Sequence, residues 1–223
     1  MTMIKIRGSS VHKVVIGLCL LVSSSAFAAE SKLKYSEFYK RLAAIEKEQL
    51  SLVYTAFYLF QADSEQACFY QQGQLLTNKE QVAVLQAKSG EILMPLSPKL
   101  KQDKADFIMT FDQVSDCRLS IQTLARPVSE GRLNTSLLMD INTEMHTLIN
   151  SNAGFWGRMF IPEYLGLNIE FDKQGIRDLP QEFIDRLQAG RLTLSSAEIA
   201  LMAEQNVSFD ADIKTIKPWL AAQ

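Results

Sequence analysis

Residues 52–60 read LVYTAFYLF, a short run of aromatic, aliphatic and β-branched side chains that is apolar on both faces. Such residues favour strands, and the run is too short to indicate a buried helix. A strand that is apolar on both faces needs cover on both sides. We therefore predict that this segment is a central strand around which the fold is built.

The sequence on both sides of this run continues the pattern. Apolar residues recur every three or four positions from 35 to 45, which predicts a leading helix with Ser36 as its N-cap. Turn-forming pairs such as Ser89-Gly90 separate a series of short strand candidates, because they interrupt the alternating pattern. These candidates cover residues 68–77, 81–87, 91–94, 105–111 and 117–125, and their spacing predicts antiparallel strands.

Helical signals dominate after residues 127–132, which read PVSEGR. Apolar residues over 133–149 form one stripe at helical spacing, and Ser195 with Glu198 matches a capping box. A short helix is expected between Pro180 and Gly190, and one strand is expected over residues 165–171.

These patterns predict an α+β fold with two parts. A leading helix and a small antiparallel β unit occupy residues 29–126. A mainly helical half follows over residues 127–223, and it can pack with the first part as one domain.

The first 28 residues have the three parts of a secretory signal peptide. They comprise a basic region, an apolar run over residues 14–22 and the cleavage motif Ala26-Phe27-Ala28. We predict cleavage between Ala28 and Ala29 and a periplasmic or secreted location. Because the apolar run is far shorter than the roughly 20 residues of a membrane span, the mature protein is not expected to be an integral membrane protein. The alternatives are an uncleaved anchor and acylation at Cys19, which Leu18 disfavours.

Cleavage leaves two cysteines, Cys68 and Cys117. An even pair in an oxidising compartment predicts one disulfide. A redox-active pair would lie closer together in the sequence, as in C-x-x-C.

Charge and residue content exclude several function classes. The full sequence has a formal charge of −2, and loss of the basic leader makes it more acidic, so nucleic-acid binding is not expected. His146 is the one histidine after the leader, which argues against triad catalysis and a zinc site. We therefore predict no catalytic residues, no metal and no cofactor. Acid pairs among Glu144, Glu163 and Glu170 leave a carboxylate-only enzyme such as a glycan hydrolase open.

One glycine-broken, aromatic segment is the candidate contact site for a partner. It contains Phe155, Trp156, Arg158, Met159, Phe160 and Ile161. Exposed aromatic clusters mark interfaces, although the same side chains can fold inward as a core plug. We predict a non-catalytic exported binding protein whose partner is an envelope protein or an apolar ligand. A carrier of small apolar ligands is a further alternative to the carboxylate-only enzyme.

Several short motifs resemble those of a known family. They are Tyr35-Ser36, Phe57-Tyr58-Leu59, Cys68, Met94-Pro95-Leu96, Cys117 with the alternating strand after it, Ala153-Gly154 and the segment PEYLGLNIEF at 162–171. The pattern resembles an uncharacterised family of exported bacterial proteins, the domain-of-unknown-function family numbered 2987, over about residues 32–172. The resemblance implies a signal peptide and a recurrent cysteine pair, and it implies no activity.

Overall fold

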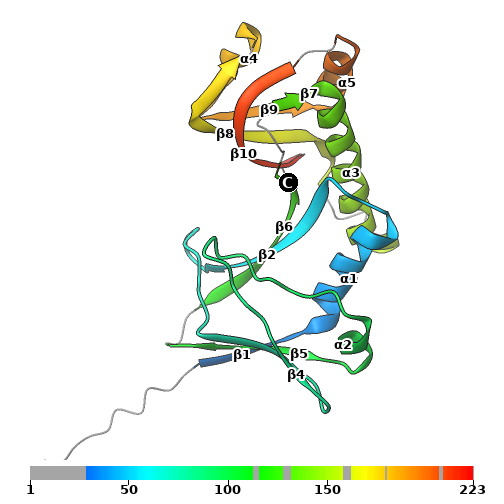
Figure 1. The fold of residues 1–223 in the computed structure, drawn as a ribbon, viewed down its shortest axis with the longest axis vertical. Helices are drawn as coiled ribbons and strands as arrows, with labels where there is room; N and C mark the ends of the chain where they lie inside the picture. The colour runs from blue at the N-terminus through cyan, green and yellow to red at the C-terminus, as the bar shows by residue number, and fades with distance from the viewer. Residues whose placement is uncertain are drawn as a thin grey trace, which may run out of the picture.

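The computed structural model describes residues 29–112, 116–127, 132–157, 162–178, 180–205 and 208–222. Its strands form three sheets that follow one another along the long axis of the molecule (Figure 1). We refer to the part around the four-stranded sheet β1-β5-β3-β4 as the lower lobe. The part around the four-stranded sheet β7-β10-β8-β9 is the upper lobe, and the pair β2-β6 lies between them.

The lower lobe contains an antiparallel sheet and two helices. Its strands are β1 (Ala29–Lys34), β3 (Gln72–Leu76), β4 (Gln81–Ala83) and β5 (Asp106–Phe111). Its helices are α1 (Tyr35–Lys47) and α2 (Pro98–Gln102). The leading helix is confirmed, but Lys34 rather than Ser36 occupies its N-cap, because β1 runs directly into the helix. Buried Tyr35 and Phe38 on α1 pack into the lower core.

The central pair consists of β2 (Val53–Gln61) and β6 (Cys117–Ala125), which are antiparallel with Val53 opposite Ala125. The strand predicted over residues 52–60 is therefore confirmed. Its side chains serve two cores, since Val53 belongs to the upper core while Phe57 and Leu59 belong to the lower one.

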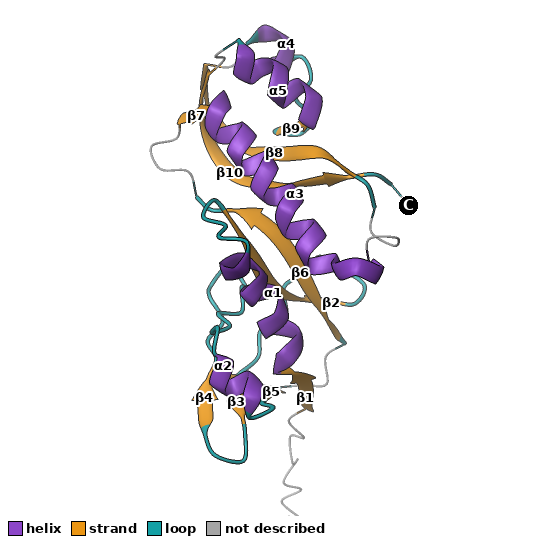
Figure 2. Cartoon of the chain, turned by 90° about the vertical axis from the view of Figure 1, so that its right-hand side faces the viewer, coloured by secondary structure: helices purple, strands orange, loops and turns teal. Residues whose placement is uncertain are grey.

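The upper lobe packs helices on one face of an antiparallel sheet (Figure 2). Its strands are β7 (Arg132–Asn134), β8 (Tyr164–Asp178), β9 (Arg191–Ser195) and β10 (Ser208–Leu220). Its helices are α3 (Thr135–Gly157), α4 (Gln181–Ile184) and α5 (Ser196–Glu204). The capping box of Ser195 and Glu198 is present at the start of α5.

The predicted mainly helical C-terminal half is wrong, because the chain is mostly β and the upper lobe is built on a sheet. The strand expected over 165–171 continues to Asp178, and its partner β10 covers a segment that alternates only weakly in sequence. Several register shifts interrupt the pairing of β8 with β10, and such shifts blur the two-residue repeat that marks a strand. Pairing between distant segments, rather than local pattern, makes these residues strands.

Three local expectations also differ from the structure. Cys117 opens a strand, but Cys68 lies before β3 in an irregular segment. Residues 91–94 form only isolated bridges, and α3 continues through Gly154 to Gly157. The predicted leader, residues 1–28, lies outside the described residues. Among the helices that are described, none is both long and apolar enough to cross a membrane.

Candidate functional site

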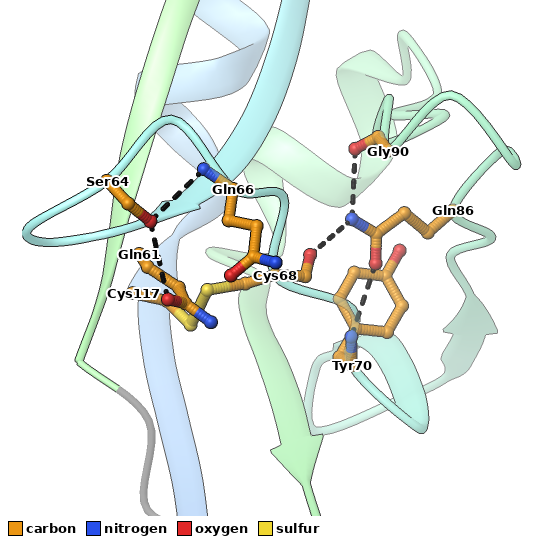
Figure 3. Close-up of a disulfide and its surroundings, with 8 residues drawn as sticks. All are labelled: Gln61, Ser64, Gln66, Cys68, Tyr70, Gln86, Gly90 and Cys117. Carbon is orange, nitrogen blue, oxygen red and sulfur yellow. Dashed lines mark hydrogen bonds between the residues drawn. A yellow bond between two sulfur atoms is a disulfide. The ribbon is translucent and has the colours of Figure 1, made fainter.

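The predicted disulfide between Cys68 and Cys117 is present, with the two Cα atoms 6.3 Å apart (Figure 3). It joins the first residue of β6 to the irregular segment that follows β2. The Gln86 side chain secures the same segment, because its Nε2 donates to the carbonyls of Cys68 and Gly90 while its Oε1 accepts from the Tyr70 N–H. These contacts fix the segment that follows β2, which pairs with the last part of that strand.

The edge of β2 that faces away from β6 is hydrogen-bonded to other backbone over only part of its length. The Leu59 carbonyl accepts from the Cys68 N–H at 2.8 Å, and the Phe57 carbonyl accepts from the Ile92 N–H at 2.8 Å. Backbone groups of alternate residues point to the same side of a strand. Thr55 therefore also directs its N–H and C=O away from β6. In the described part of the chain, no strand pairs with this stretch of the edge.

A pocket of about 330 Å³ lies beside this unpaired edge. Helix α1, strand β2, the segment 91–94 and Arg126 form its walls. Most of the lining is apolar, and a few polar groups are placed within it, as in typical small-ligand sites. The lining residues are Leu42, Ile45, Tyr54, Thr55, Phe57, Glu91, Ile92, Leu93, Met94 and Arg126.

Thr55 is the unusual member of this lining. Its side chain is only 4% exposed, and within the described residues its Oγ1 is buried without a hydrogen-bond partner. An unsatisfied buried hydroxyl costs about 1–3 kcal/mol. Thr123 lies directly opposite on β6, and yet it supplies no hydrogen bond to this oxygen. Thr55 thus brings a buried hydroxyl and two backbone groups to a pocket in which the described chain satisfies none of them on that side.

Two side chains of opposite charge, Glu91 and Arg126, line the pocket, and both affect the pKa of Tyr54, which burial raises. Glu91 forms a bridge with Tyr58, and burial raises the pKa of its carboxyl. Burial, followed by the Glu91 charge, raises the pKa of Tyr58 to about 12. The backbone N–H of Arg126 donates to the Leu52 carbonyl at 2.7 Å, and the Arg126 guanidinium lies 5.6 Å from the centre of the Tyr54 ring.

A second groove, on the outer face of β8 and β9, is larger and more polar. It encloses about 740 Å³ and includes Trp219. Several of its polar groups are engaged with protein atoms. Arg186 pairs with Glu198 at 2.7 Å and donates to the Thr193 carbonyl, while the Thr193 hydroxyl donates to Asn168 at 2.7 Å. These groups need no ligand to complete their hydrogen bonds.

A third groove is formed by the end of β2, the turn after it and β6, with Lys217 of β10 beside them. It encloses about 500 Å³, and Arg118 and Lys217 are among its lining residues. No buried unpaired polar atom has been found among the described residues that line it. The pocket at β2 is therefore the stronger candidate.

The aromatic segment predicted as a contact site is not tested by the structure. Phe155 and Trp156 lie near the end of α3, where side chains are not described. Arg158, Met159, Phe160 and Ile161 lie outside the described residues. The partner contact at this segment stays a prediction.

The carboxylates considered for an enzyme have separate positions. Glu144 accepts hydrogen bonds from the N–H groups of Ser51 and Leu52, at 2.9 and 2.7 Å, and so holds the start of β2. Glu170 pairs with Lys214 at 2.7 Å, and Glu163 is exposed. His146, on exposed α3 surface, stacks on the Tyr164 ring. In the described chain, no three His, Cys, Asp or Glu side chains gather to hold a metal ion.

Sequence reasoning missed the pocket at β2. Glu91 and Arg126 form no motif, and they meet the strand only in the folded chain. One signal was present, because Thr55 is the single residue of the run LVYTAFYLF without an aliphatic or aromatic side chain.

Comparison with known proteins identifies the family to which the chain belongs. Neither the curated proteins nor the solved structures contain a match to the chain. The family model described as "Protein of unknown function (DUF2987)" matches residues 27–171, a range that contains every lining residue of the pocket at β2. The resemblance seen in the sequence motifs is thereby confirmed, and the chain belongs to the DUF2987 family.

Proposed function

We propose that this protein is an exported, non-catalytic binding protein whose ligand occupies the pocket beside the unpaired edge of β2. One observation carries the proposal: a mostly apolar pocket beside an unpaired strand edge is lined by Thr55, whose buried hydroxyl has no partner among the described residues. A ligand that displaces the surrounding side chains far enough to reach this hydroxyl would give it a hydrogen bond, and apolar walls supply the area that binding buries.

Export is supported by the leader pattern and by the disulfide. Disulfides persist in oxidising compartments, which is compatible with a periplasmic or secreted location. The mass of the protein recovered from the periplasm should correspond to a chain that begins at Ala29.

The non-catalytic character is argued from the lining of the pocket. Glycan hydrolysis uses two carboxylates on either side of the bond that is cut. The described lining offers Glu91 alone, with no histidine or cysteine beside it. Glu91 therefore has no second acid with which to share such a reaction.

Native mass spectrometry of the protein purified from the envelope fraction tests the binding proposal. We expect the wild type to carry a bound small molecule and Thr55→Val to lose it, since valine keeps the shape of threonine and removes the hydroxyl. Thr123→Val is the matched control, because Thr123 faces Thr55 across the strand pair and does not line the pocket. An unliganded wild type, or equal retention by both variants, would overturn the proposal.

A further inference from the structure

We infer that the third groove is a second binding site, separate from the pocket at β2, and that it takes a saccharide that carries an acid group. Arg118 and Lys217 carry this step, because they bring two positive charges into one groove from separate parts of the fold. Arg118 belongs to β6 of the central pair, and Lys217 belongs to β10 of the upper lobe. Both side chains are exposed, so the groove is open to a ligand.

Neither of these two cations forms an ion pair with an acid of the described chain. Glu170, the acid nearest to Lys217 along the sheet, pairs with Lys214 at 2.7 Å instead. Glu65 is the one acid among the described residues that line the groove, and it forms no ion pair with either cation. Like charges that share a groove repel each other, and a bound anion relieves this repulsion. Because the whole chain has a formal charge of −2, such a groove is a local centre of attraction for anions.

The polar part of the lining favours a sugar over a bare anion. Two amides and two hydroxyls line the groove, and such groups can both donate hydrogen bonds to sugar hydroxyls and accept them. These groups belong to Gln61, Ser64, Ser120 and Gln122. The hydrogen bonds among them are long, at 3.3 Å from Ser64 to Gln61 and 3.5 Å from Gln122 to Ser120, so a ligand can replace them at little cost.

Phe60 places an apolar ring beside Arg118. The two residues are directly opposite each other on β2 and β6, so their side chains lie on the same face of the pair. The Phe60 ring is half-buried and stacks on the Tyr58 ring, with the ring centres 5.9 Å apart. Such a ring can pack against the C–H groups of a sugar while Arg118 holds the acid group. An inorganic anion would leave the ring unused.

The third groove adjoins the second groove at Lys217. Lys217 and Trp219 are two positions apart on β10 with no register shift between them, so their side chains lie on the same face of the sheet. Asn168 is the pairing partner of Lys217 on β8, and both Asn168 and Trp219 line the second groove. A saccharide of two or three units can therefore reach from Arg118 to the Trp219 ring.

Calorimetric titration of the full mature chain with four probes tests the inference. The probes are trigalacturonate, its methyl ester, glucose phosphorylated on its primary hydroxyl, and inorganic phosphate. The ester keeps the sugar and removes the charge. We expect the ester to bind about tenfold more weakly than trigalacturonate, or worse, because it loses the charge-assisted contacts. Inorganic phosphate should bind more weakly than either acidic sugar.

The four titrations have outcomes that decide the matter. Tighter binding of trigalacturonate than of glucose phosphate would identify a carboxylate as the acid group, and the reverse would identify a phosphate. Equal binding of trigalacturonate and its ester would overturn the inference. Binding of neither acidic sugar, or of inorganic phosphate as tightly as the tighter of them, would do so as well.

Variants place the ligand in the groove. Arg118→Gln and Lys217→Gln should each weaken the binding of the preferred acidic sugar about tenfold, since each removes one charge-assisted contact. Lys88→Gln is the matched control, because it removes the same charge from an exposed position outside the groove. Unchanged affinity in both groove variants, or an equal loss in the control, would overturn the assignment.

Tryptophan fluorescence tests the extension toward Trp219. The chain has two tryptophans, so Trp156→Phe leaves Trp219 as the one reporter. We expect trigalacturonate to shift its emission and Trp219→Ala to weaken the binding of this probe. Binding of trigalacturonate with unchanged emission would overturn the extension into the second groove.

The two proposed sites can fail separately. Thr55→Val should leave the binding of the acidic sugars unchanged, and Arg118→Gln should leave the small molecule in the pocket at β2 in place, since Arg118 does not line that pocket. Loss of acidic-sugar binding in Thr55→Val would overturn the separation of the two sites.

Discussion

The two lobes of this protein reach a buried core by different means. In the lower lobe the strands are short, and aromatic rings fill the core. The centre of the Phe38 ring lies 4.9 Å from that of Phe57 and 5.6 Å from that of Phe107, in edge-to-face arrangements. A disulfide reinforces this lobe. The upper lobe sets the aliphatic residues of a long helix against a sheet with two long strands. A lobe of short segments thus depends on large aromatics and a covalent link, whereas long paired elements suffice in the other.

The two cores meet along β2, and the candidate pocket lies where they meet. Val53 packs in the upper core and Phe57 in the lower core, while Thr55 stands between them. No described strand pairs with the outer edge of β2 at this point, although its residues are buried. The comparison suggests that a binding site arises here because two independently packed cores leave a gap beside their shared strand.

The largest effect is expected from truncation of the aromatic core. Phe38→Ala should lower the free energy of unfolding by about 3–5 kcal/mol, because it removes a fully buried ring that contacts two others. Leu194→Ala in the upper core should cost about 2–5 kcal/mol and is the matched comparison. Urea unfolding measures both. If the Phe38 variant lost less than about 1 kcal/mol, the lower lobe would not depend on its rings as described.

Removal of the disulfide should have the next largest effect. The double substitution Cys68→Ser and Cys117→Ser should cost about 2–4 kcal/mol, because it frees a long loop in the unfolded chain. Amide hydrogen exchange should show that protection is lost in the lower lobe and in the segment that follows β2. Protection of α5 in the upper lobe is the internal reference, and an equal loss there would show that the lobes unfold as one unit.

The smallest effect concerns acid pH. Hydrogen bonds from Lys32 and Lys34 lower the pKa of Asp106 in the lower lobe, and the bond from Lys214 lowers that of Glu170 in the upper lobe. A carboxyl with a lowered folded pKa adds stability above its unfolded pKa, and loses that contribution as the pH falls through the folded value. Both lobes should therefore weaken slightly below about pH 4.

Paired variants test this acid effect. Asp106→Asn and Glu170→Gln should each be slightly less stable than the wild type at pH 7, and the difference should be smaller at pH 3, below the unfolded pKa of both groups. Urea midpoints at the two pH values give the comparison. The loss should be small because exposed ion pairs contribute little. A difference as large at pH 3 as at pH 7 would assign the effect to packing rather than charge.

Local pattern determined several elements of this protein without any help from the fold. The apolar run that became β2, the stripe that became α3 and the capping box at Ser195 each act over a few neighbouring residues. The cysteine count did the same for the disulfide, since two cysteines allow one pairing. The run, the stripe and the capping box depend on side chains that are close in the sequence, so each can be recognised there. The cysteine pair is 49 residues apart and was recognised from the number of cysteines left after the predicted leader.

Only the tertiary structure decided the upper sheet and the candidate site. The strand β10 alternates weakly and becomes a strand by pairing with β8, and β1 lacks a local signal until β5 pairs with it. The pocket joins Thr55, Glu91 and Arg126, which are far apart along the chain. Strand pairing is non-local, and its register decides which edge stays unpaired, so the pocket beside β2 exists only after the chain has folded.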